Sequence, residues 1–311
     1  MIKMKSLINC LFLLCVALVF ACNSNTKTEV RTAVGVDSTT ITNKKFALAF
    51  QSEDKIVASS IDTLKQISFG GATDPAISPD GNKLAYTVMD SAGHRTIWVA
   101  DMENKSQLQL KVPNDNYYQA MWAANGNKIA FNIFNESNIW KVGLINADNT
   151  GFIVLDNSSK RNAYSPTWKN ENEIIAHDLS NLYTYNISGK IINTQSIEKL
   201  IGADYLISSS NRFIYTKDGK KLVFNAGNDD KAEDLEGPME AVYILDLASS
   251  KIERISKKGM NVSYIFLTAD DRIFYSGAEK PFTKTMIYVS DLKGNIQKIV
   301  DHGDNPSGAL K

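Results

Sequence analysis

Cysteine is scarce in this chain of 311 residues, and its three copies, Cys10, Cys15 and Cys22, lie near the N-terminus. The rest of the sequence therefore has no disulfide framework, no cysteine-ligated zinc site and no cysteine nucleophile. Such a chain must be stabilised by burial of apolar surface. Its length and its 43% content of hydrophobic residues allow this for one large domain.

Catalytic motifs are scarce as well. The three histidines, His94, His177 and His302, lie far apart and have no cysteine or carboxylate partner at a recognisable motif spacing. No Gly-x-Ser-x-Gly sequence occurs, which excludes the usual nucleophile turn of α/β-hydrolases. We therefore expect a protein that is not an enzyme and holds no metal ion, with a polysaccharide lyase or hydrolase as the alternative.

Neither sign of charge is in excess, because 34 basic residues are balanced by 34 acidic ones. Removal of an N-terminal signal takes away Lys3 and Lys5 and leaves 32 basic residues. Nucleic-acid binding needs a clustered excess of Lys and Arg, so this balance disfavours a nucleic acid as partner.

The N-terminus contains the pattern of a secretory signal. Residues 1–21 combine two lysines with an apolar run, residues 11–20, that is too short to span a membrane. The sequence Val19-Phe20-Ala21-Cys22 resembles the lipobox of bacterial lipoproteins. This resemblance implies cleavage before Cys22, with a diacylglycerol on its thiol and an N-acyl chain such as palmitate on its amino group. An ordinary secretory signal with an incidental cysteine is the alternative.

The lipid places the expected protein in the cell envelope. Asn23 stands where some bacteria use Asp to retain lipoproteins in the inner membrane, so the outer membrane is favoured. Residues 22–43 are rich in Ser, Thr and Asn and show no apolar periodicity, which predicts a flexible tether. We therefore expect a signal peptide at residues 1–21, a lipid-anchored tether at 22–43 and one folded domain at 44–311.

An internal repeat dominates that domain, with Gly126 following Gly81 by 45 residues. Each copy alternates apolar with β-branched or aromatic positions, and its Asp-Gly or Asn-Gly corners favour tight hairpins. The four tryptophans fall within these strands and are expected in the core. The copies include residues 74–86, 122–131, 168–176, 215–224 and 267–275. Four-stranded units at this spacing are typical of β-propeller blades.

A sixth unit is divided between the two ends of the domain. Residues 45–67 supply three strands, and residues 305–310 supply the missing first strand. Pairing of the chain ends removes unpaired strand edges. The sequence therefore predicts an all-β fold, a six-bladed β-propeller of four-stranded blades, whose ring is closed by pairing of the C-terminal strand with the N-terminal blade.

The first full repeat carries a family resemblance. Its phrase Ser78-Pro79-Asp80-Gly81, followed by Ile97-Trp98-Val99-Ala100-Asp101, resembles the WD40-like (PD40) repeat of the bacterial TolB family and of propellers fused to prolyl oligopeptidases. The resemblance covers residues 44–311 and implies a TolB-like propeller. The α/β domain that precedes the TolB propeller has no counterpart in the sequence, so Tol–Pal function is not implied.

Binding is expected on the face that carries the links between blades and the loops between second and third strands. These loops vary in length, and variable loops on a rigid scaffold usually carry binding specificity. The candidate residues are Tyr117, Tyr118, Arg161, Tyr164 and Tyr264 near the channel rim, and Asp229, Asp230, Glu233 and Asp234 in the acidic loop 227–240. Aromatic groups there suit a sugar or a peptide. The alternatives are tyrosines that pack between blades and an acidic loop that is only solvated.

These features combine into one hypothesis of function. We expect a lipid-anchored, non-catalytic propeller of the cell envelope that binds an envelope protein or a glycan ligand through its variable loop face. No cofactor is expected apart from the lipid on Cys22. The alternatives are a glycan-active lyase or hydrolase at the channel rim and a purely structural spacer in an envelope assembly.

Overall fold

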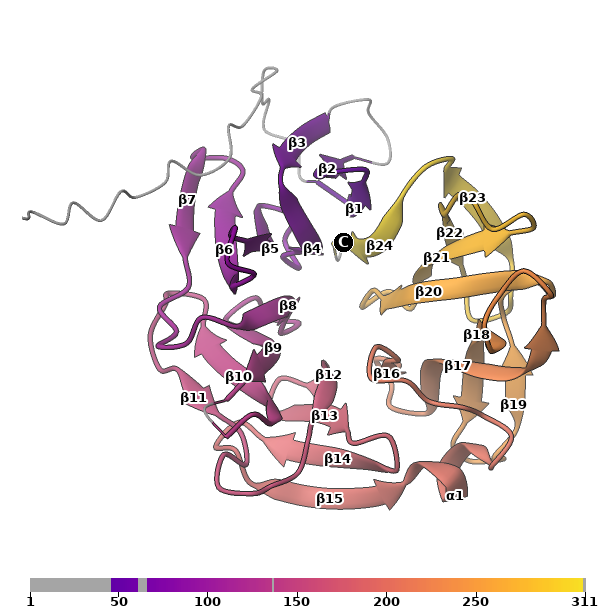
Figure 1. Cartoon of the computed structure of the whole chain (residues 1–311). Coiled ribbons are helices and arrows are strands. Elements are labelled where there is room, and N and C mark those ends of the chain that lie inside the picture. Colours follow the sequence, from indigo (N-terminus) through magenta and orange to yellow (C-terminus); the bar gives the residue numbers. More distant parts are fainter. Residues whose placement is uncertain (1–45, 61–65, 136, 310–311) are drawn as a thin grey trace, which may run out of the picture. The chain divides into compact units, whose positions relative to one another are not determined.

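The computed structural model describes residues 46–60, 66–135 and 137–309, with only the backbone given for Asp229. In these residues, 24 strands form six four-stranded sheets arranged around a common centre (Figure 1). The fold is therefore an all-β, six-bladed β-propeller, and this prediction is confirmed. The predicted signal peptide, the tether and Cys22 lie outside the described residues.

Each blade runs outward from an innermost strand. Blade 1 consists of β24 (Asp304–Gly308), β1 (Leu48–Ser52), β2 (Lys55–Ser59) and β3 (Gln66–Gly70), and blade 2 of β4 (Ala72–Ile77), β5 (Lys83–Met89), β6 (Arg95–Asp101) and β7 (Ser106–Gln109). Blade 3 consists of β8 (Tyr117–Trp122), β9 (Lys128–Phe134), β10 (Trp140–Asn146) and β11 (Ile153–Val154), and blade 4 of β12 (Tyr164–Asn170), β13 (Glu173–His177), β14 (Asn181–Asn186) and β15 (Ile191–Ser196). Blade 5 consists of β16 (Phe213–Tyr215), β17 (Lys221–Lys231), β18 (Pro238–Asp246) and β19 (Ile252–Arg254), and blade 6 of β20 (Met260–Leu267), β21 (Ile273–Glu279), β22 (Met286–Ser290) and β23 (Ile296–Val300).

Blade 1 takes its innermost strand from the other end of the chain. β24 pairs antiparallel with β1, and Gly308 lies opposite Leu48. Asn305 also joins this blade to blade 2, because its Nδ2 donates to Gln51 Oε1 at 3.2 Å and to Asp74 Oδ1 at 2.9 Å. The predicted closure of the ring by the C-terminal strand is confirmed.

The turn between the first and second strands of a blade is held by a hydroxyl and a carboxylate. In blade 2, Ser78 Oγ donates to Asp80 Oδ1 at 2.6 Å and accepts from the Lys83 backbone N–H at 2.8 Å. Gly81 lies in this turn at φ 73°, a left-handed conformation that glycine adopts without strain. The Ser-Pro-Asp-Gly phrase is therefore a turn motif. We call the side of the ring with these turns the turn face, and the opposite side the loop face.

Apolar clusters of the described residues fill the spaces between neighbouring blades. The cluster between blades 2 and 3, for example, contains Ala85, Ile97, Tyr117 and Phe131, all of which are fully buried. A strand alternates its side chains between the two faces of its sheet, so each blade contributes to two such clusters. This packing holds the innermost strands at fixed positions around the centre.

One region differs from the expectation for blade 5. Residues 227–240, expected as a long acidic loop, instead extend the hairpin of β17 and β18, with a bulge between Gly227 and Lys231. The extension has a pairing partner at its edge, because Leu206 and Gly227 each donate a backbone N–H to the other's carbonyl at 2.9 Å. Only a short tip, residues 232–237, is left outside the strands.

One helix also interrupts the β-structure of the described residues. α1 (Ile197–Ile201) follows Ser196, whose side chain caps it by accepting from the Lys199 backbone N–H at 3.3 Å. Ile197 and Ile201 are buried and attach this turn of helix to the cluster between blades 4 and 5. No helix in the described part of the chain is long and apolar enough to cross a membrane.

Candidate functional site: the central channel

The innermost strands place one equivalent residue of each blade around the channel. Their equivalence follows from the pairing of each innermost strand with the second strand of its blade. In blades 1 to 6 these residues are Asn305, Asp74, Gln119, Ser165, Arg212 and Tyr264. Each of them carries a hydrogen-bonding side chain, so we call the set the polar ring.

Bulges in the strands shape this ring. Asn305, Asp74, Gln119 and Ser165 have positive φ angles of 46°, 51°, 57° and 49°. In each of these four blades the strand pairing shifts at the same position. A bulge turns a side chain out of the normal alternation, and non-glycine residues at positive φ cluster at ligand sites. The bulges therefore give a physical reason to look for a site in the channel.

Two charges of opposite sign dominate the polar ring. Arg212 is buried, and its Nη1 donates to the Ile265 carbonyl at 2.9 Å. Burial lowers the pKa of Arg212, while the attraction of Asp74 opposes that shift. Burial likewise raises the pKa of Asp74, against hydrogen bonds and the attraction of Arg212. The ring thus holds a carboxyl acceptor and guanidinium donors close together.

On the turn face, next to the polar ring, the channel opens into a cavity of about 280 Å³ that we call the cup. Its lining is mainly apolar and includes Trp122, Trp168, Tyr215 and Phe266. The first three stand three residues after the polar ring in blades 3, 4 and 5, where blade 1 has Gly308. An apolar cavity of roughly 150 Å³ is enough to bind benzene, so the cup has room for an aromatic group.

Both tryptophans of the cup are fixed by hydrogen bonds from one blade to the next. Trp122 Nε1 donates to the Ala76 carbonyl at 2.8 Å, and Trp168 Nε1 donates to the Met121 carbonyl at 2.9 Å. Because these bonds use the indole N–H groups, the rings present apolar surface to the cavity. The walls of the cup are therefore preorganised.

Charged side chains line the opening of the cup. Lys169, Glu171 and Lys217 belong to its lining and are exposed. Lys169 Nζ lies 2.8 Å from Glu173 Oε2 and 5.5 Å from the ring centre of Tyr215. An apolar interior with a few polar groups is the usual composition of a ligand site.

A small chamber of about 10 Å³ adjoins the cup. The two share the wall residues Ala76, Met121 and Phe266. The chamber is otherwise lined by Asp74, Pro75, Gln119, Ala120, Arg212 and Asn305. Four of these residues belong to the polar ring, and the volume suits about one water-sized group.

A larger hollow of about 640 Å³ shares Pro79, Trp122 and Ala124 with the cup. Phe46 and Ala309 form part of its wall. Phe46 and Ala309 each end a described segment. We therefore restrict the candidate site to the cup and the chamber.

On the loop face, the structure brings together three of the residues predicted from the sequence. Tyr118 lies within electrostatic range of Tyr164 and Tyr264, and burial raises the pKa of all three. The Arg95 guanidinium stacks on Tyr118, with its carbon 3.7 Å from the ring centre. This mouth of the channel is thus occupied in part by contacts within the chain.

Tyr117 does not reach the channel. It is fully buried, and its hydroxyl donates to the Leu110 carbonyl at 3.0 Å and accepts from Gln109 Nε2 at 3.2 Å. Its ring lies 5.7 Å from that of Phe131. Tyr117 therefore packs between blades 2 and 3, which was the alternative left open for the tyrosines.

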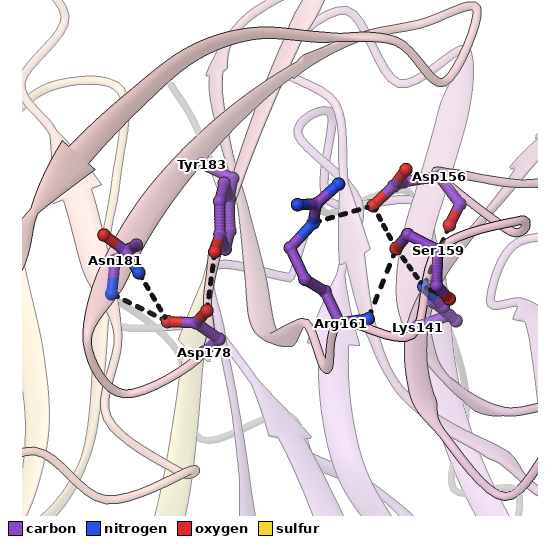
Figure 2. Close-up of polar contacts among 7 residues, drawn as sticks. All are labelled: Lys141, Asp156, Ser159, Arg161, Asp178, Asn181 and Tyr183. Atoms are coloured by element: carbon purple, nitrogen blue, oxygen red, sulfur yellow. Dashed lines mark hydrogen bonds and ion pairs between the residues drawn. The ribbon is translucent and has the colours of Figure 1, made fainter.

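Arg161 belongs to a separate polar cluster at the junction of blades 3 and 4 (Figure 2). Its Nε donates to Asp156 Oδ2 at 3.2 Å. The buried Lys141 donates from Nζ to the carbonyls of Asp156 and Ser159 and to Ser159 Oγ, at 2.8, 2.9 and 2.8 Å. Burial lowers the pKa of Lys141, but three acceptors for its ammonium hydrogens identify it as a cationic anchor and not as a base for Ser159.

The same close-up contains a tyrosine bound to a carboxylate. Tyr183 donates its hydroxyl to Asp178 Oδ2 at 2.6 Å, and its ring centre lies 5.6 Å from the Arg161 guanidinium (Figure 2). Burial and this carboxylate raise the pKa of Tyr183 to about 12. The phenol is therefore a hydrogen-bond donor at neutral pH and not a nucleophile.

The acidic candidates are spread along the tip of the blade 5 hairpin. Asp230 Oδ2 lies 2.8 Å from Arg254 Nη1, and exposed Asp234 lies 3.4 Å from Lys280 Nζ. Glu233 is exposed, and the side chain of Asp229 is outside the description. In the described part of the chain, no group of three His, Cys, Asp or Glu residues could hold a metal ion.

His177 is a buried structural group. Its Nε2 donates to the Asn211 carbonyl at 2.9 Å, and its Nδ1 accepts from the Leu179 backbone N–H at 3.3 Å. Burial lowers its pKa to about 4, so the ring is neutral at physiological pH. Both nitrogens are engaged, and the ring has no free position for a ligand or a proton transfer.

Sequence reasoning placed the tryptophans in the core and did not identify the cup. Trp122 and Trp168 do contact the core, but they also line the cavity together with Tyr215. A usable signal was present, because an aromatic residue occupies the same position in three consecutive repeats. That signal becomes meaningful only once the repeat position is known to face the channel.

No family model matches this chain, and no curated protein sequence matches it either. Its fold is similar to TolB from Acinetobacter baumannii, which is 12% identical with a TM-score of 0.63 over 86% of this chain and 67% of that chain. A putative TolB from Agrobacterium tumefaciens is 13% identical, with a TM-score of 0.57 over 85% of this chain and 91% of that chain. The described part of the chain is therefore a TolB-like six-bladed β-propeller.

The propeller domain of the Trilobed protease from Pyrococcus furiosus is similar as well. It is 15% identical, with a TM-score of 0.56 over 84% of this chain and 97% of that chain, and is described as having an open velcro topology. In the present chain β24 pairs with β1 instead. Identities this low show the fold alone, and the same fold serves proteins of different function.

Proposed function

We propose that this chain is a lipid-anchored protein of the cell envelope, and that its propeller is a non-catalytic module that binds a ligand or partner in the cup. The observation that carries the proposal is the preorganised aromatic cavity of about 280 Å³ at one mouth of the channel. Its walls are fixed by neighbouring blades, which reduces the entropy lost on binding.

The geometry favours the turn face over the loop face for this role. On the loop face, Tyr117 is buried, Tyr118 is stacked against Arg95, and Arg161 is paired with Asp156. These side chains stabilise the blades and have little capacity left for a partner. In the cup, Trp168 and Tyr215 are partly buried, as Tyr118 is, but they line a cavity.

Two observations support a module without catalysis. The buried His177 is neutral and fully hydrogen-bonded. Lys141, the lysine nearest to a serine hydroxyl in Figure 2, is a cation with three acceptors. Neither group supplies the base that an activated nucleophile or a glycan lyase needs.

Site-specific photo-crosslinking in living cells tests the binding site. A benzophenone amino acid is introduced at Lys217, on the rim of the cup, and in a matched variant at Lys160, an exposed lysine between blades 3 and 4. We expect one dominant adduct from position 217 and none from position 160. Adducts from position 160 alone would indicate a binding site on the loop face. Turnover of an added polysaccharide would indicate that the protein is an enzyme and not a binding module.

The lipid anchor is tested by replacing its attachment site. Cys22→Ser is expected to shift the protein from the membrane fraction to the soluble fraction, because only a lipidated cysteine provides the acyl chains. Cys15→Ser, within the apolar run of the signal, is the matched control and should leave the protein in the membrane fraction. Retention of Cys22→Ser in the membrane fraction would reject the anchor without affecting the proposed site.

A further inference from the structure

We propose that the cup recognises an aromatic ring that carries a hydroxyl group, with the ring in the cup and the hydroxyl in the chamber beside Asp74 and Arg212. This inference rests on the proposed function, since it names the chemistry of the group that the cup receives. It is carried by the two adjoining cavities and by the residues that line them.

The first step of the argument is volume. The cup, with about 280 Å³, admits a six-membered ring and the atoms that attach it to a larger molecule. The chamber, with about 10 Å³, admits one water-sized group. A phenol matches these two volumes, because its ring fits the cup and its hydroxyl group, which is bonded to the ring, is comparable in size to a water molecule.

The second step is the composition of the lining that the two spaces share. Ala76, Met121 and Phe266 border both the cup and the chamber. The carbonyls of Ala76 and Met121 already accept from the indole groups of the two tryptophans. Inside the cup, the ring of the ligand therefore meets mainly apolar surface before its hydroxyl reaches the polar ring.

The third step is charge. A ligand carboxylate entering the chamber meets the like charge of Asp74, and a ligand ammonium meets that of Arg212. A neutral hydroxyl meets no like charge, and it both donates and accepts. It can donate to the Asp74 carboxyl and accept from Arg212, which has five N–H groups and uses one of them, on Nη1, for the Ile265 carbonyl.

Gln119 completes the set of groups around the hydroxyl. Its Oε1 accepts from Asn132 Nδ2 at 2.8 Å, which orients the amide and leaves its NH₂ group as the donor. Asn305 also lines the chamber, and its Nδ2 donates to Asp74 Oδ1 at 2.9 Å. The acceptor that the phenol needs is thus fixed in place by the closing strand.

The charged residues at the rim indicate which kind of molecule carries the aromatic ring. Lys169, Glu171 and Lys217 offer donors and acceptors of both charges at the opening. These groups suit the backbone of a peptide whose tyrosine side chain enters the cup. A small free phenol has the same ring and hydroxyl but makes no contact with the rim, so a pair of probes separates the two sources.

Calorimetry on the detergent-solubilised full chain tests the inference with p-cresol and toluene, which differ only in the hydroxyl. We expect p-cresol to bind roughly tenfold more tightly, the effect of one hydrogen bond to a charged or buried partner. Equal affinities, or no binding of either compound, overturn the inference. Tighter binding of Gly-Tyr-Gly than of p-cresol assigns the ring to a peptide, and weaker binding assigns it to a small phenol.

Variants locate the hydroxyl. Asp74→Asn is expected to reduce the preference for p-cresol to about threefold or less, whereas Asp178→Asn, a partly buried carboxylate of blade 4, should leave it unchanged. An unchanged preference in folded Asp74→Asn counts against the assigned position. If that variant does not fold, the relative affinities of the wild-type protein for p-cresol and toluene still test the inference. A crosslink at position 217 without a preference for p-cresol would reject this inference alone and keep the proposed function.

Discussion

The two mouths of the channel use similar aromatic residues in different ways. On the loop face, Arg95 covers Tyr118, and the neighbouring Trp140 lies edge-on to it at 5.5 Å between ring centres. On the turn face, Trp168 and Tyr215 border a cavity. At the loop-face mouth, side chains from β6, β8 and β10 therefore pack against one another, while on the turn face the short repeated turns surround the open space. In this propeller, the uniform turns border the candidate cavity.

Removal of β24, the strand that contributes to both mouths of the channel, is expected to have the largest effect. Deletion of residues 304–311 removes Asn305 from the polar ring and Ser307, whose Oγ accepts from the Ile77 backbone N–H at 2.9 Å. We expect the free energy of unfolding to fall by at least about 3 kcal/mol, since several buried hydrogen bonds of about 1 kcal/mol each are lost together with strand pairing. Urea unfolding followed by circular dichroism measures this. Deletion of residues 310–311 alone is the control, and equal midpoints for both deletions would contradict a structural role of β24.

Low pH is expected to destabilise the fold through His177, which lies on the loop-face side of the ring. Its ring centre is 6.0 Å from that of Tyr164. Its folded pKa of about 4 lies below the unfolded value of about 6.5, so only the unfolded chain binds the proton between these pH values. The contribution of neutral His177 to the free energy of unfolding is therefore fully present above pH 6.5, and about 3 kcal/mol of it is lost as the pH approaches 4. His177→Gln should remove this part of the pH dependence, as measured by urea unfolding from pH 4 to pH 7. Parallel pH profiles for the two proteins would show that His177 does not cause it.

The smallest expected effect comes from replacing one tryptophan at each mouth of the channel. Trp168→Ala is expected to lower the crosslinking yield at position 217 about tenfold, because tryptophan is enriched among the few binding-site residues whose truncation costs about 2 kcal/mol or more. Trp140→Ala on the loop face should leave the yield within about twofold. Both tryptophans are partly buried, so they form a matched pair. A larger loss for Trp140→Ala would place the partner on the loop face.

The sequence predicted the blades well because their signals are local. The Ser78 to Gly81 turn has its own hydrogen bonds, and similar bonds recur at Thr216 and Thr268 in blades 5 and 6. Closure by residues 305–310 was also predictable, since one blade lacked a first strand. The hairpin beyond Gly227 was not, because its extension depends on pairing with Leu206, which lies outside the repeat.

The cup was missed for a related reason. Its aromatic residues have the same alternation as core residues, and a strand pattern does not distinguish a side chain that faces a neighbouring blade from one that also borders the channel. The partnership of Asp74 with Arg212 and Asn305 joins blades 1, 2 and 5 across long stretches of sequence. Only the closed ring brings these groups together.

The closing strand also constrains how the protein is made. The contact between Asn305 and Asp74 spans 231 residues, and contacts of such high sequence separation slow folding. A chain that is synthesised from its N-terminus cannot complete blade 1 until β24 has been made. Until then the edge of β1 lacks its partner, and such an edge invites association with other chains. Folding of this protein therefore depends on keeping the incomplete chain apart from its neighbours until β24 is available.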